Sequence, residues 1–288
     1  MLTEEQFVAQ QRSLGRRIHF RDGVWWVEVY PFYCKPAFEF KIFDPGEAVP
    51  ARFPSILGYS HQVRTASLGN RTVSFMVLDE PEMRTFSLSA LSANKRSVVR
   101  RGLKRCSTGV IGDLDPVIER IREINISQAI RQQKRAGAVT PIRRYTKEES
   151  EWRSQMRREF ALKGREWWGA SVNGVLAAYL RTYQVDGVRV IQQTRADTDY
   201  LKFYPMDALY FSILSAAAAD SSCERIVNGS PLHRSLNHYK EQFLFRAVSL
   251  PYYSSHAGWI ELYKRVSPTV KKVTNWHIKN NSSRAVAG

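Results

Sequence analysis

The sequence predicts a mixed α/β fold in which a central sheet is flanked by helices. Segments rich in β-branched and aromatic residues, separated by turn residues, occur before residue 80 and again after residue 166. Segments with apolar side chains at helical spacing lie between them and after them. With 288 residues, 43% of them hydrophobic, the chain can bury a full core as one large domain or as two fused small ones.

The N-terminal region is rich in strand signals. Residues 23–32 are mostly β-branched and aromatic, and residues 38–42 alternate apolar and polar side chains at the period of a strand. Residues 71–78 repeat this alternation before Asp-Glu-Pro interrupts it. We therefore expect residues 1–90 to form a strand-rich half that packs on the main domain.

Helical signals dominate the middle of the chain. Asp115 is a capping residue, and Pro116 after it suits the first position of a helix whose apolar residues recur over 117–124. Thr146 and Glu149 have the spacing of a capping box, with an apolar stripe behind them. The sequence therefore predicts one helix from about residue 117 and a second one capped by Thr146.

A three-strand meander is predicted from residue 167. Its strands cover 167–172, 175–183 and 188–194, and they are joined by Asn-Gly and Asp-Gly, which supply the positive φ angles of tight hairpins. Five elements follow: a helix over 205–219, a short strand over 225–228, a helix over 230–243 capped by Ser230-Pro231, and strands over 244–251 and 258–264. The main domain is thus expected at 91–265. Residues 266–288 form a C-terminal tail that is expected to be partly flexible, because its end is small and polar.

Net charge is the strongest compositional signal. A formal charge of +16 attracts anionic partners such as tRNA, DNA or a phosphorylated cofactor, although a basic surface that only keeps the protein soluble is the simpler alternative. The sequence has no apolar run long enough to span a bilayer and no signal peptide at its start, so we expect a cytoplasmic protein without membrane insertion. The three cysteines lie far apart and lack metal-ligand spacing, so neither a disulfide framework nor a metal site is expected.

Four segments and their order point to a known family. The segments are 172–179 with its Asn-Gly turn, 204–209 with a helix that starts at Tyr-Pro, 227–230 with a strand that ends in Asn-Gly, and 239–243 with Tyr-Lys-x-x-Phe. Over roughly residues 90 to 265, this order resembles the acyltransferase half of the FemAB-like proteins, a branch of the GNAT superfamily. The resemblance implies a GNAT-like central mixed sheet flanked by helices. A degenerate tandem GNAT arrangement, with a second such half at the N-terminus, is one interpretation of residues 1–90.

The family resemblance also implies the co-substrate. The chain lacks the Arg/Gln-x-x-Gly-x-Gly/Ala loop with which GNAT acetyltransferases hold the pyrophosphate of acetyl-CoA. Some FemAB-like proteins instead take the acyl group from aminoacyl-tRNA. Both acyl-CoA and aminoacyl-tRNA therefore stay open as co-substrates, and no metal is implied.

Candidate catalytic residues lie near the two later helices. In the family pattern, Lys240 is the lysine of the Tyr/Phe-Lys motif, where a cation stabilises negative charge during aminolysis. On a helix over 231–243 it shares a face with His233, which could serve as a base for the attacking amine, while Leu236 belongs to the buried stripe. Tyr204 borders the acyl pocket in the family pattern. A surface lysine, an exposed histidine and a core tyrosine are the corresponding structural alternatives.

The segment 95–105 carries six cations in eleven residues. As a helix it presents most of this charge on one side and an apolar stripe on the other, as phosphate binding requires, although Gly102 weakens the helix. The residues predicted to bind the co-substrate are Arg100, Arg101, Lys104 and Arg105, together with Asn228 from the family pattern. The simpler interpretation of such a segment is a solvated face.

Together these observations predict an acyl- or aminoacyltransferase that moves an activated acyl group to an acceptor amine. A transferase that modifies a nucleic-acid base is one alternative, and a non-catalytic nucleic-acid-binding protein is the other. The sequence lacks four common catalytic motifs: the Walker loop, the dinucleotide glycine fingerprint, His-Glu-x-x-His and Gly-x-Ser-x-Gly. Their absence argues against phosphoryl transfer, hydride transfer and metal- or serine-dependent hydrolysis.

Overall fold

The computed structural model describes residues 1–53, 55–133, 142–231 and 234–255. The chain divides into two compact units, of which the first contains Met1–Leu2 and Phe75–Val248, and the second contains Thr3–Ser74 and the residues from Ser249 onward. The expected domain ranges, 1–90 and 91–265, stay a prediction, because contacts group residues without showing which part folds alone. The tail 266–288 and the strand expected at 258–264 lie outside the described residues.

The first unit is built on a mixed sheet with the strand order β5-β10-β9-β8-β7-β6. These strands are β5 (Arg71–Asp79), which begins in the second unit, β6 (Ser107–Val110), β7 (Arg165–Val172), β8 (Val175–Val185), β9 (Val188–Ala196) and β10 (Arg225–Val227). The predicted meander is confirmed as β7, β8 and β9, with both turn dipeptides at positive φ, from 44° at Asp186 to 80° at Gly174 and Gly187. β10 runs parallel to β9 and antiparallel to β5. This mixed sheet flanked by helices is the α/β fold that the sequence predicts.

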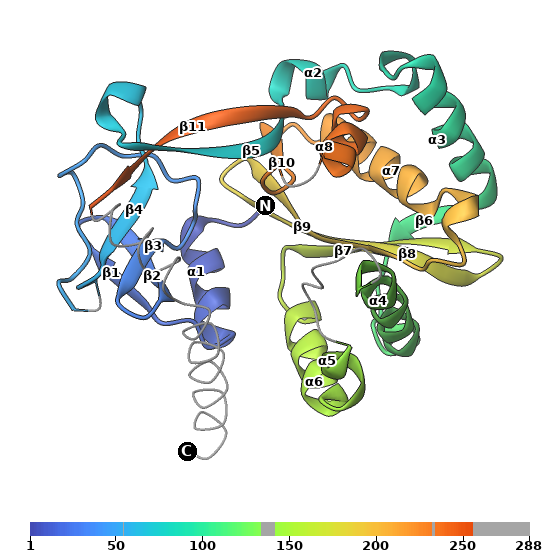
Figure 1. Ribbon diagram of the computed structural model, residues 1–288, viewed down its shortest axis with the longest axis horizontal. Helices are drawn as coiled ribbons and strands as arrows, with labels where there is room; N and C mark the ends of the chain where they lie inside the picture. The colour runs from blue at the N-terminus through green and yellow to red at the C-terminus, as the bar shows by residue number, and fades with distance from the viewer. Residues whose placement is uncertain (54, 134–141, 232–233, 256–288) are drawn as a thin grey trace. The chain divides into compact units, whose positions relative to one another are not determined.

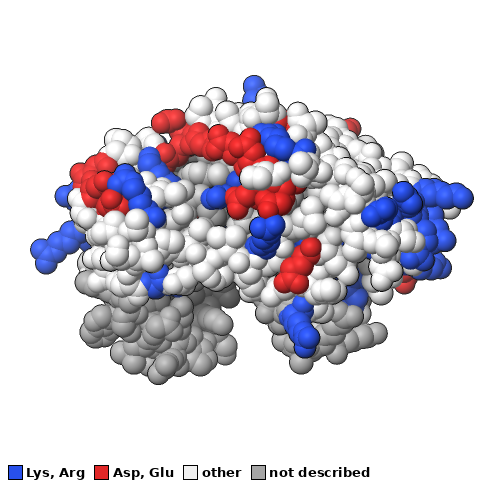
Figure 2. Space-filling view, turned by 90° about the horizontal axis from the view of Figure 1, so that it is seen from above, with Lys and Arg blue, Asp and Glu red and all other residues white. Residues whose placement is uncertain are grey.

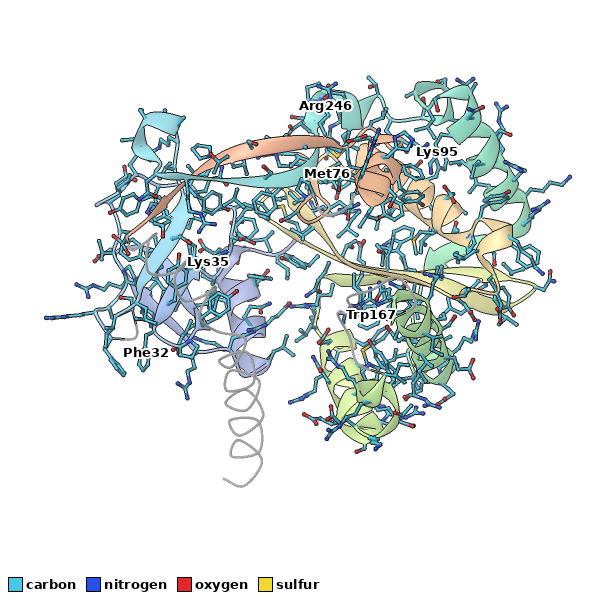
Figure 3. The ribbon with its side chains drawn as sticks, viewed as in Figure 1. Phe32, Lys35, Met76, Lys95, Trp167 and Arg246 are labelled. Atoms are coloured by element: carbon cyan, nitrogen blue, oxygen red, sulfur yellow. The ribbon has the colours of Figure 1, made fainter. Side chains whose placement is uncertain are left out.

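Helices cover both faces of this sheet. Figure 1 shows α3 (Ala93–Arg105), α7 (Pro205–Ala219) and α8 (Arg234–Glu241) on one side of the meander. On the other side are α4 (Ile118–Gln133), α5 (Arg143–Thr146) and α6 (Glu149–Phe160). The adjacent residues Trp167 and Trp168 serve opposite faces, since Trp167 packs with α4 and α6 and Trp168 packs against the core under α7 (Figure 3). Within the described ranges, no helix is both long and apolar enough to cross a bilayer.

The capping box predicted at Thr146 is wrong. The Thr146 hydroxyl donates a hydrogen bond to the Ile142 carbonyl, and α6 begins at Glu149 with Glu148 as its N-cap. Thr146 is taken up by the short helix α5 that precedes α6. The capping-box pattern lies within a few residues of the start of α6, but Thr146 is not its N-cap.

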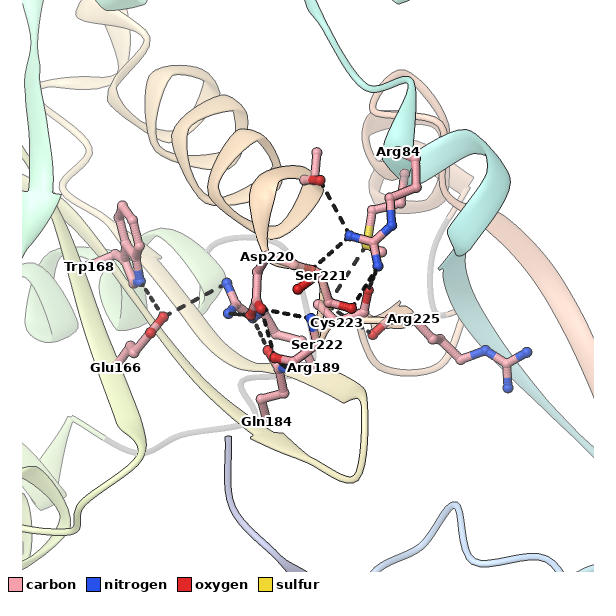
Figure 4. A network of polar contacts seen from close by, with 12 residues as sticks. Arg84, Glu166, Trp168, Gln184, Arg189, Asp220, Ser221, Ser222, Cys223 and Arg225 are labelled. Atoms are coloured by element: carbon pink, nitrogen blue, oxygen red, sulfur yellow. Dashed lines mark hydrogen bonds and ion pairs between the residues drawn. The ribbon is translucent and has the colours of Figure 1, made fainter.

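The C-terminal end of α7 is fixed by Arg84 from α2 (Glu80–Arg84). The Arg84 guanidinium donates to four carbonyl oxygens, at distances from 2.7 to 3.3 Å. These carbonyls belong to Ala218, Asp220, Ser221 and Cys223. Asp220 also accepts from Arg189 on β9, so the segment between α7 and β10 is held from two sides (Figure 4). The helix end and the start of β10 therefore form one rigid corner.

The second unit contains α1 (Glu4–Ser13) and strands in the order β1-β2-β3-β4-β11. The strands are β1 (Ile18–Arg21), β2 (Val24–Tyr30), β3 (Tyr33–Pro36), β4 (Gly58–Gln62) and β11 (Arg246–Ser254), which begins in the first unit. The strand predicted over 38–42 is wrong, because this stretch turns back on itself with a hydrogen bond from Lys41 N–H to the Phe38 carbonyl. Phe38 is buried against Phe7 with 6.3 Å between ring centroids. The alternation of apolar and polar residues over 38–42 therefore reflects which side chains are buried and not the pairing of a strand.

Gly102 allows α3 to approach α7 closely. A Cβ atom at this position would lie 2.8 Å from the Tyr204 carbonyl oxygen and 3.3 Å from the Ala208 Cβ. The glycine that lowers the helix propensity of α3 is therefore also the residue that lets α3 pack on the start of α7.

Replacing Gly102 with alanine should destabilise the protein by about 1–3 kcal/mol, although alanine is the better helix former, because the backbone oxygen must be pushed away. Urea unfolding of the G102A variant measures this loss. Gly109 on β6 is the matched control, since a Cβ there meets nothing within 4 Å. Equal stability of the two variants would contradict the role given to Gly102.

Candidate active site

The parallel strands β9 and β10 separate part of the way along. They pair only from Arg225↔Val188 to Val227↔Val190. Asn228 then turns toward β5, where its N–H donates to the Met76 carbonyl at 2.8 Å. Among the described residues, no strand pairs with the 191–196 stretch of β9 on the side of β10. This opening, which we call the split, leaves the 191–196 stretch without a partner strand on that side. Side chains take part of its backbone hydrogen bonds, since the Ala196 N–H donates to Gln128 and the Arg195 side chain donates to the Thr194 carbonyl.

A β-bulge lies in β9 where the split begins. The pairing with β8 passes from Thr182↔Ile191 to Arg181↔Gln193, so Gln192 is the extra residue. A bulge increases the local twist and bends its strand. β9 is therefore irregular at the level where β10 ends.

Polar side chains from three elements meet beside the split. The Asn228 Nδ2 atom donates to the Tyr210 hydroxyl of α7 at 3.0 Å, and both residues are buried. Burial raises the pKa of Tyr210 to about 12, against the opposing effect of hydrogen bonds with Asn228 and with Thr194 of β9. The phenol is therefore protonated at neutral pH. It lies next to the first residue after β10.

Lys240 belongs to the same group. Its side chain is 4% exposed, and its Nζ atom donates to the Asn228 carbonyl oxygen at 2.5 Å. Burial lowers the pKa of Lys240 below its ordinary value. No carboxylate within the described ranges forms an ion pair with it. Two N–H donors of the ammonium group have no hydrogen bond to a described residue.

The faces predicted for α8 are partly wrong. Lys240 was expected on an open face and Leu236 in the buried stripe, but Lys240 is buried and Leu236 is 37% exposed. Tyr239 and Phe243 pack on the Tyr210 ring, with centroids 5.6 and 5.3 Å away, and this packing turns Lys240 inward. His233 lies outside the described residues, so its catalytic role stays a prediction.

Lys95 is buried and joins α3 to α7 through an ion pair, so it does not belong to a basic surface. Its Nζ atom lies 2.5 Å from Asp207 Oδ1 in the first turn of α7 and is 4.0 Å from the Tyr239 ring centroid and 4.1 Å from that of Phe243. Burial lowers the pKa of Lys95, whereas burial and the nearby Asp207 carboxylate raise the pKa of Tyr239. Figure 3 labels Lys95 at this position. The prediction that the whole segment 95–105 presents charge outward is therefore wrong at Lys95.

The remaining cations of α3 form a surface at its C-terminal end. Five exposed residues make up this surface, which we call the basic surface: Arg100, Arg101, Lys104, Arg105 and Lys202. The Arg101 guanidinium carbon lies 4.7 Å from the centroid of the Tyr204 ring, and Arg105 donates to the Lys202 carbonyl. Figure 2 shows Lys and Arg side chains gathered over this end of α3.

Tyr204 connects the basic surface to α7. It adopts φ 60°, a conformation that bulky residues rarely occupy, and Pro205 follows it at the first position of the helix. The structure thus groups Tyr204 with Arg101 and Arg105, and groups Lys240 with Asn228. The helix α7 links the two groups, because Tyr204 is its N-cap and its residue Tyr210 accepts a hydrogen bond from Asn228.

Sequence reasoning missed Tyr210, Thr194 and the ion pair of Lys95 with Asp207. Lys95 could have been found, because it lies four residues before Val99 on the same helical face, which faces the core. Nothing in the local sequence distinguishes Tyr210 from the apolar residues around it. The described residues hold no group of three His, Cys, Asp or Glu side chains suited to a metal ion.

A groove of about 430 Å³ lies at the C-terminal end of α8. Its lining includes the carboxylates of Glu82 and Glu241, of which Glu82 is paired with Arg246. Leu244, also in the lining, has φ 67°. Glu241 directly follows Lys240, so an acidic group borders the helix that carries the buried lysine.

Three solved structures share the fold of this chain. FemX superposes with a TM-score of 0.57 and 9% sequence identity, over 91% of this chain and 93% of FemX. L-PGS from Bacillus licheniformis superposes with a TM-score of 0.57 and 12% identity, over 96% of this chain and 98% of L-PGS. The C-terminal domain of a protein described as a lysylphosphatidylglycerol synthetase from Agrobacterium fabrum superposes with a TM-score of 0.55 and 12% identity, over 93% of this chain and 91% of that domain. No protein-family model matches the chain, and no curated protein matches it in sequence. The mixed α/β fold expected from the FemAB-like resemblance is confirmed, since the chain shares the fold of FemX.

The Asp207→Asn variant should lose about 3–5 kcal/mol of stability, because it leaves the buried Lys95 cation without a counter-ion. The double variant Lys95→Met, Asp207→Leu should lose less, since it removes both charges. Denaturant unfolding of both variants tests this order. A double variant that is less stable than Asp207→Asn would contradict the interpretation.

The Lys240→Met variant should show a pH-dependent difference from the wild type. Because folding lowers the pKa of Lys240, the unfolded chain binds more protons between the folded pKa and the ordinary value of 10.5. Wild-type stability should therefore rise with pH across this window relative to the variant. Urea unfolding from neutral pH to 10.5 measures this difference, and exposed Lys147→Met is the matched control. A difference that is constant with pH would exclude a penalty from burying the Lys240 charge.

Proposed function

We propose that this chain transfers an activated acyl or aminoacyl group to an acceptor amine, with the reacting carbonyl placed in the split between β9 and β10. The observation that carries the proposal is the combination of an unpaired strand edge with the buried group of Tyr210, Asn228 and Lys240 beside it. Groups of this kind can stabilise charge that develops on a carbonyl oxygen in a site with little water.

The chemistry needs no covalent enzyme intermediate. The acceptor nitrogen attacks the carbonyl carbon, and the C=O electron pair moves to oxygen to give a tetrahedral oxyanion. The N–H donors of Lys240 that bind no described residue, or backbone N–H groups of β9, hydrogen-bond to this oxyanion. When the intermediate collapses, the bond to the leaving oxygen or sulfur breaks, and the proton lost by the amine passes to the leaving group through water or substrate.

The basic surface is the proposed site for the phosphates of the donor. Its guanidinium and ammonium groups lie beside Tyr204, where α7 begins, and a helix N-terminus attracts anions. Side chains here take the place of the missing glycine-rich loop. Acyl-CoA and aminoacyl-tRNA both present phosphates, and the shared fold of FemX and L-PGS supports donors of these classes.

The groove beside α8 supports an amine as the acceptor. Glu82 is paired with Arg246 in the lining, so Glu241 supplies the uncompensated negative charge next to the helix that carries Lys240, in a chain whose net charge is +16. A cationic ligand is attracted locally to such carboxylates and repelled by most of the remaining surface.

Co-purification followed by a transfer assay tests the function. The purified protein is analysed by mass spectrometry and ultraviolet absorbance for bound CoA thioester or tRNA, and it is then incubated with labelled acetyl-CoA or aminoacyl-tRNA and a panel of amines. Lys240→Met should slow transfer by about 10²–10³-fold while donor binding persists, because a donor to the oxyanion is lost. Arg101→Gln, Arg105→Gln and Lys202→Gln together should weaken donor binding and reduce the log-log salt slope by about 2 if the donor is a single-stranded tRNA end.

A matched control removes the same amount of charge elsewhere in the first unit. Lys147, Arg158 and Lys163 are exposed, and their combined change to glutamine should leave donor binding unchanged. Label that appears on the nucleic acid itself would identify a base as the acceptor. Bound nucleic acid without any transfer, and without an effect of Lys240→Met, would identify a non-catalytic binding protein instead.

A further inference from the structure

The second unit exposes several apolar side chains on two adjoining loops, which we call the aromatic patch. It consists of Tyr30, Phe32, Phe53, Ile56 and Leu57, which are 53%, 39%, 70%, 55% and 36% exposed. The Phe32 and Phe53 ring centroids are 5.6 Å apart, and the Leu57 N–H donates to the Phe32 carbonyl at 2.8 Å. Isolated exposed apolar residues are ordinary, but five of them on two loops joined by the Phe32–Phe53 ring contact mark an interaction surface.

The backbone holds the patch in a defined conformation. Phe32 has φ 63°, a strained value for a bulky residue, and its N–H is bound by the Glu28 carboxylate at 2.8 Å. The neighbouring turn is closed by Ser55, whose N–H and hydroxyl donate to the carbonyls of Arg52 and Ala51. These bonds fix two loop tips side by side. Phe32 lies at the outer edge of its unit (Figure 3).

The rim of the patch is cationic. Arg52 is exposed in the same turn as Phe53, and the Arg17 side chain is 70% exposed. The nearby Glu28 carboxylate is 14% exposed and is held by Arg17 and by the Phe32 N–H. The charge of Arg17 is therefore partly offset by Glu28, and the exposed positive charge of the rim comes mainly from Arg52, which forms no ion pair within the described residues.

We propose that the aromatic patch docks the protein on an anionic lipid surface. Aromatic and aliphatic side chains at loop tips insert at the level of the headgroups, and arginines beside them pair with lipid phosphates. Ile56 and Leu57 have no ring on which a nucleic-acid base can stack, so a lipid surface fits the composition better than single-stranded nucleic acid. A symmetric second copy fits less well, because it would bring Arg52 of both copies together. The proposal does not depend on the proposed transferase function.

A fluorescent label at the patch tests the proposal in the full chain. Cys34, Cys106 and Cys223 are buried, and burial raises the pKa of each thiol, so a cysteine from Phe53→Cys can be labelled selectively with a nitrobenzoxadiazole dye. Vesicles of phosphatidylcholine with phosphatidylglycerol should shift its emission to the blue, and vesicles of phosphatidylcholine alone should do so much less. The matched control is the label at Ala66→Cys, which is exposed beyond the other end of β4 and should not respond.

Vesicle co-sedimentation of unlabelled protein provides a second readout. Phe53→Ser with Ile56→Ser should weaken binding by at least about tenfold, because two exposed apolar side chains that would enter the lipid are lost. Arg52→Gln should weaken it about fivefold on anionic vesicles only. Unchanged binding in the serine variant, or equal binding to both kinds of vesicle, would overturn the proposal. So would an emission shift that appears without vesicles as protein concentration rises, which indicates a second copy, or one that a single-stranded RNA oligonucleotide produces.

Discussion

The arrangement of the candidate site depends on the early end of the β9–β10 ladder. Parallel pairing continues only to Val227↔Val190, and the next two residues are drawn toward β5, since the Asn228 N–H donates to the Met76 carbonyl and the Met76 N–H donates to the Gly229 carbonyl. A backbone that leaves one strand must satisfy its polar groups elsewhere. The Asn228 carbonyl does so by accepting from Lys240, which explains why a cation is buried there. The early end of the β9–β10 pairing therefore creates the unpaired carbonyl that the buried Lys240 binds.

Helix α7 links the parts of the site. Its start carries Tyr204 beside the arginines of α3, and its first turn holds Asp207, the counter-ion of Lys95. Tyr210, on the second turn, reaches Asn228. Because Arg84 fixes the far end, the helix has little freedom to slide along the sheet (Figure 4). A change at the basic surface can therefore alter the geometry of the split only through a small rotation of α7 or through local unfolding of its first turn.

Much of the fold was predictable from the sequence, because its signals are local. The meander follows from two turn dipeptides, and α7 begins at Pro205 and ends at Ala219 as the apolar run suggests. Errors occurred where burial and strand pairing diverge, as over 38–42, and where a helix face is set by distant partners. The orientation of Lys240 depends on Tyr210 and Phe243 packing together, and no spacing rule within α8 contains that information. The split itself is invisible in the sequence, since it requires knowledge of where two distant strands stop pairing.

Both compact units are closed by residues that lie far apart in the chain. The second unit joins Thr3–Ser74 to residues from Ser249 onward, and its β4 pairs with Tyr252, Tyr253 and Ser254. In the first unit, the carbonyl partners of Arg84 lie between Ala218 and Cys223, 134 to 139 residues later in the chain. During synthesis from the N-terminus, the early strands must therefore wait for almost the whole chain before they are completed. The nascent protein should expose an incomplete sheet edge for most of its translation, which makes it a natural client for chaperones that shield such edges.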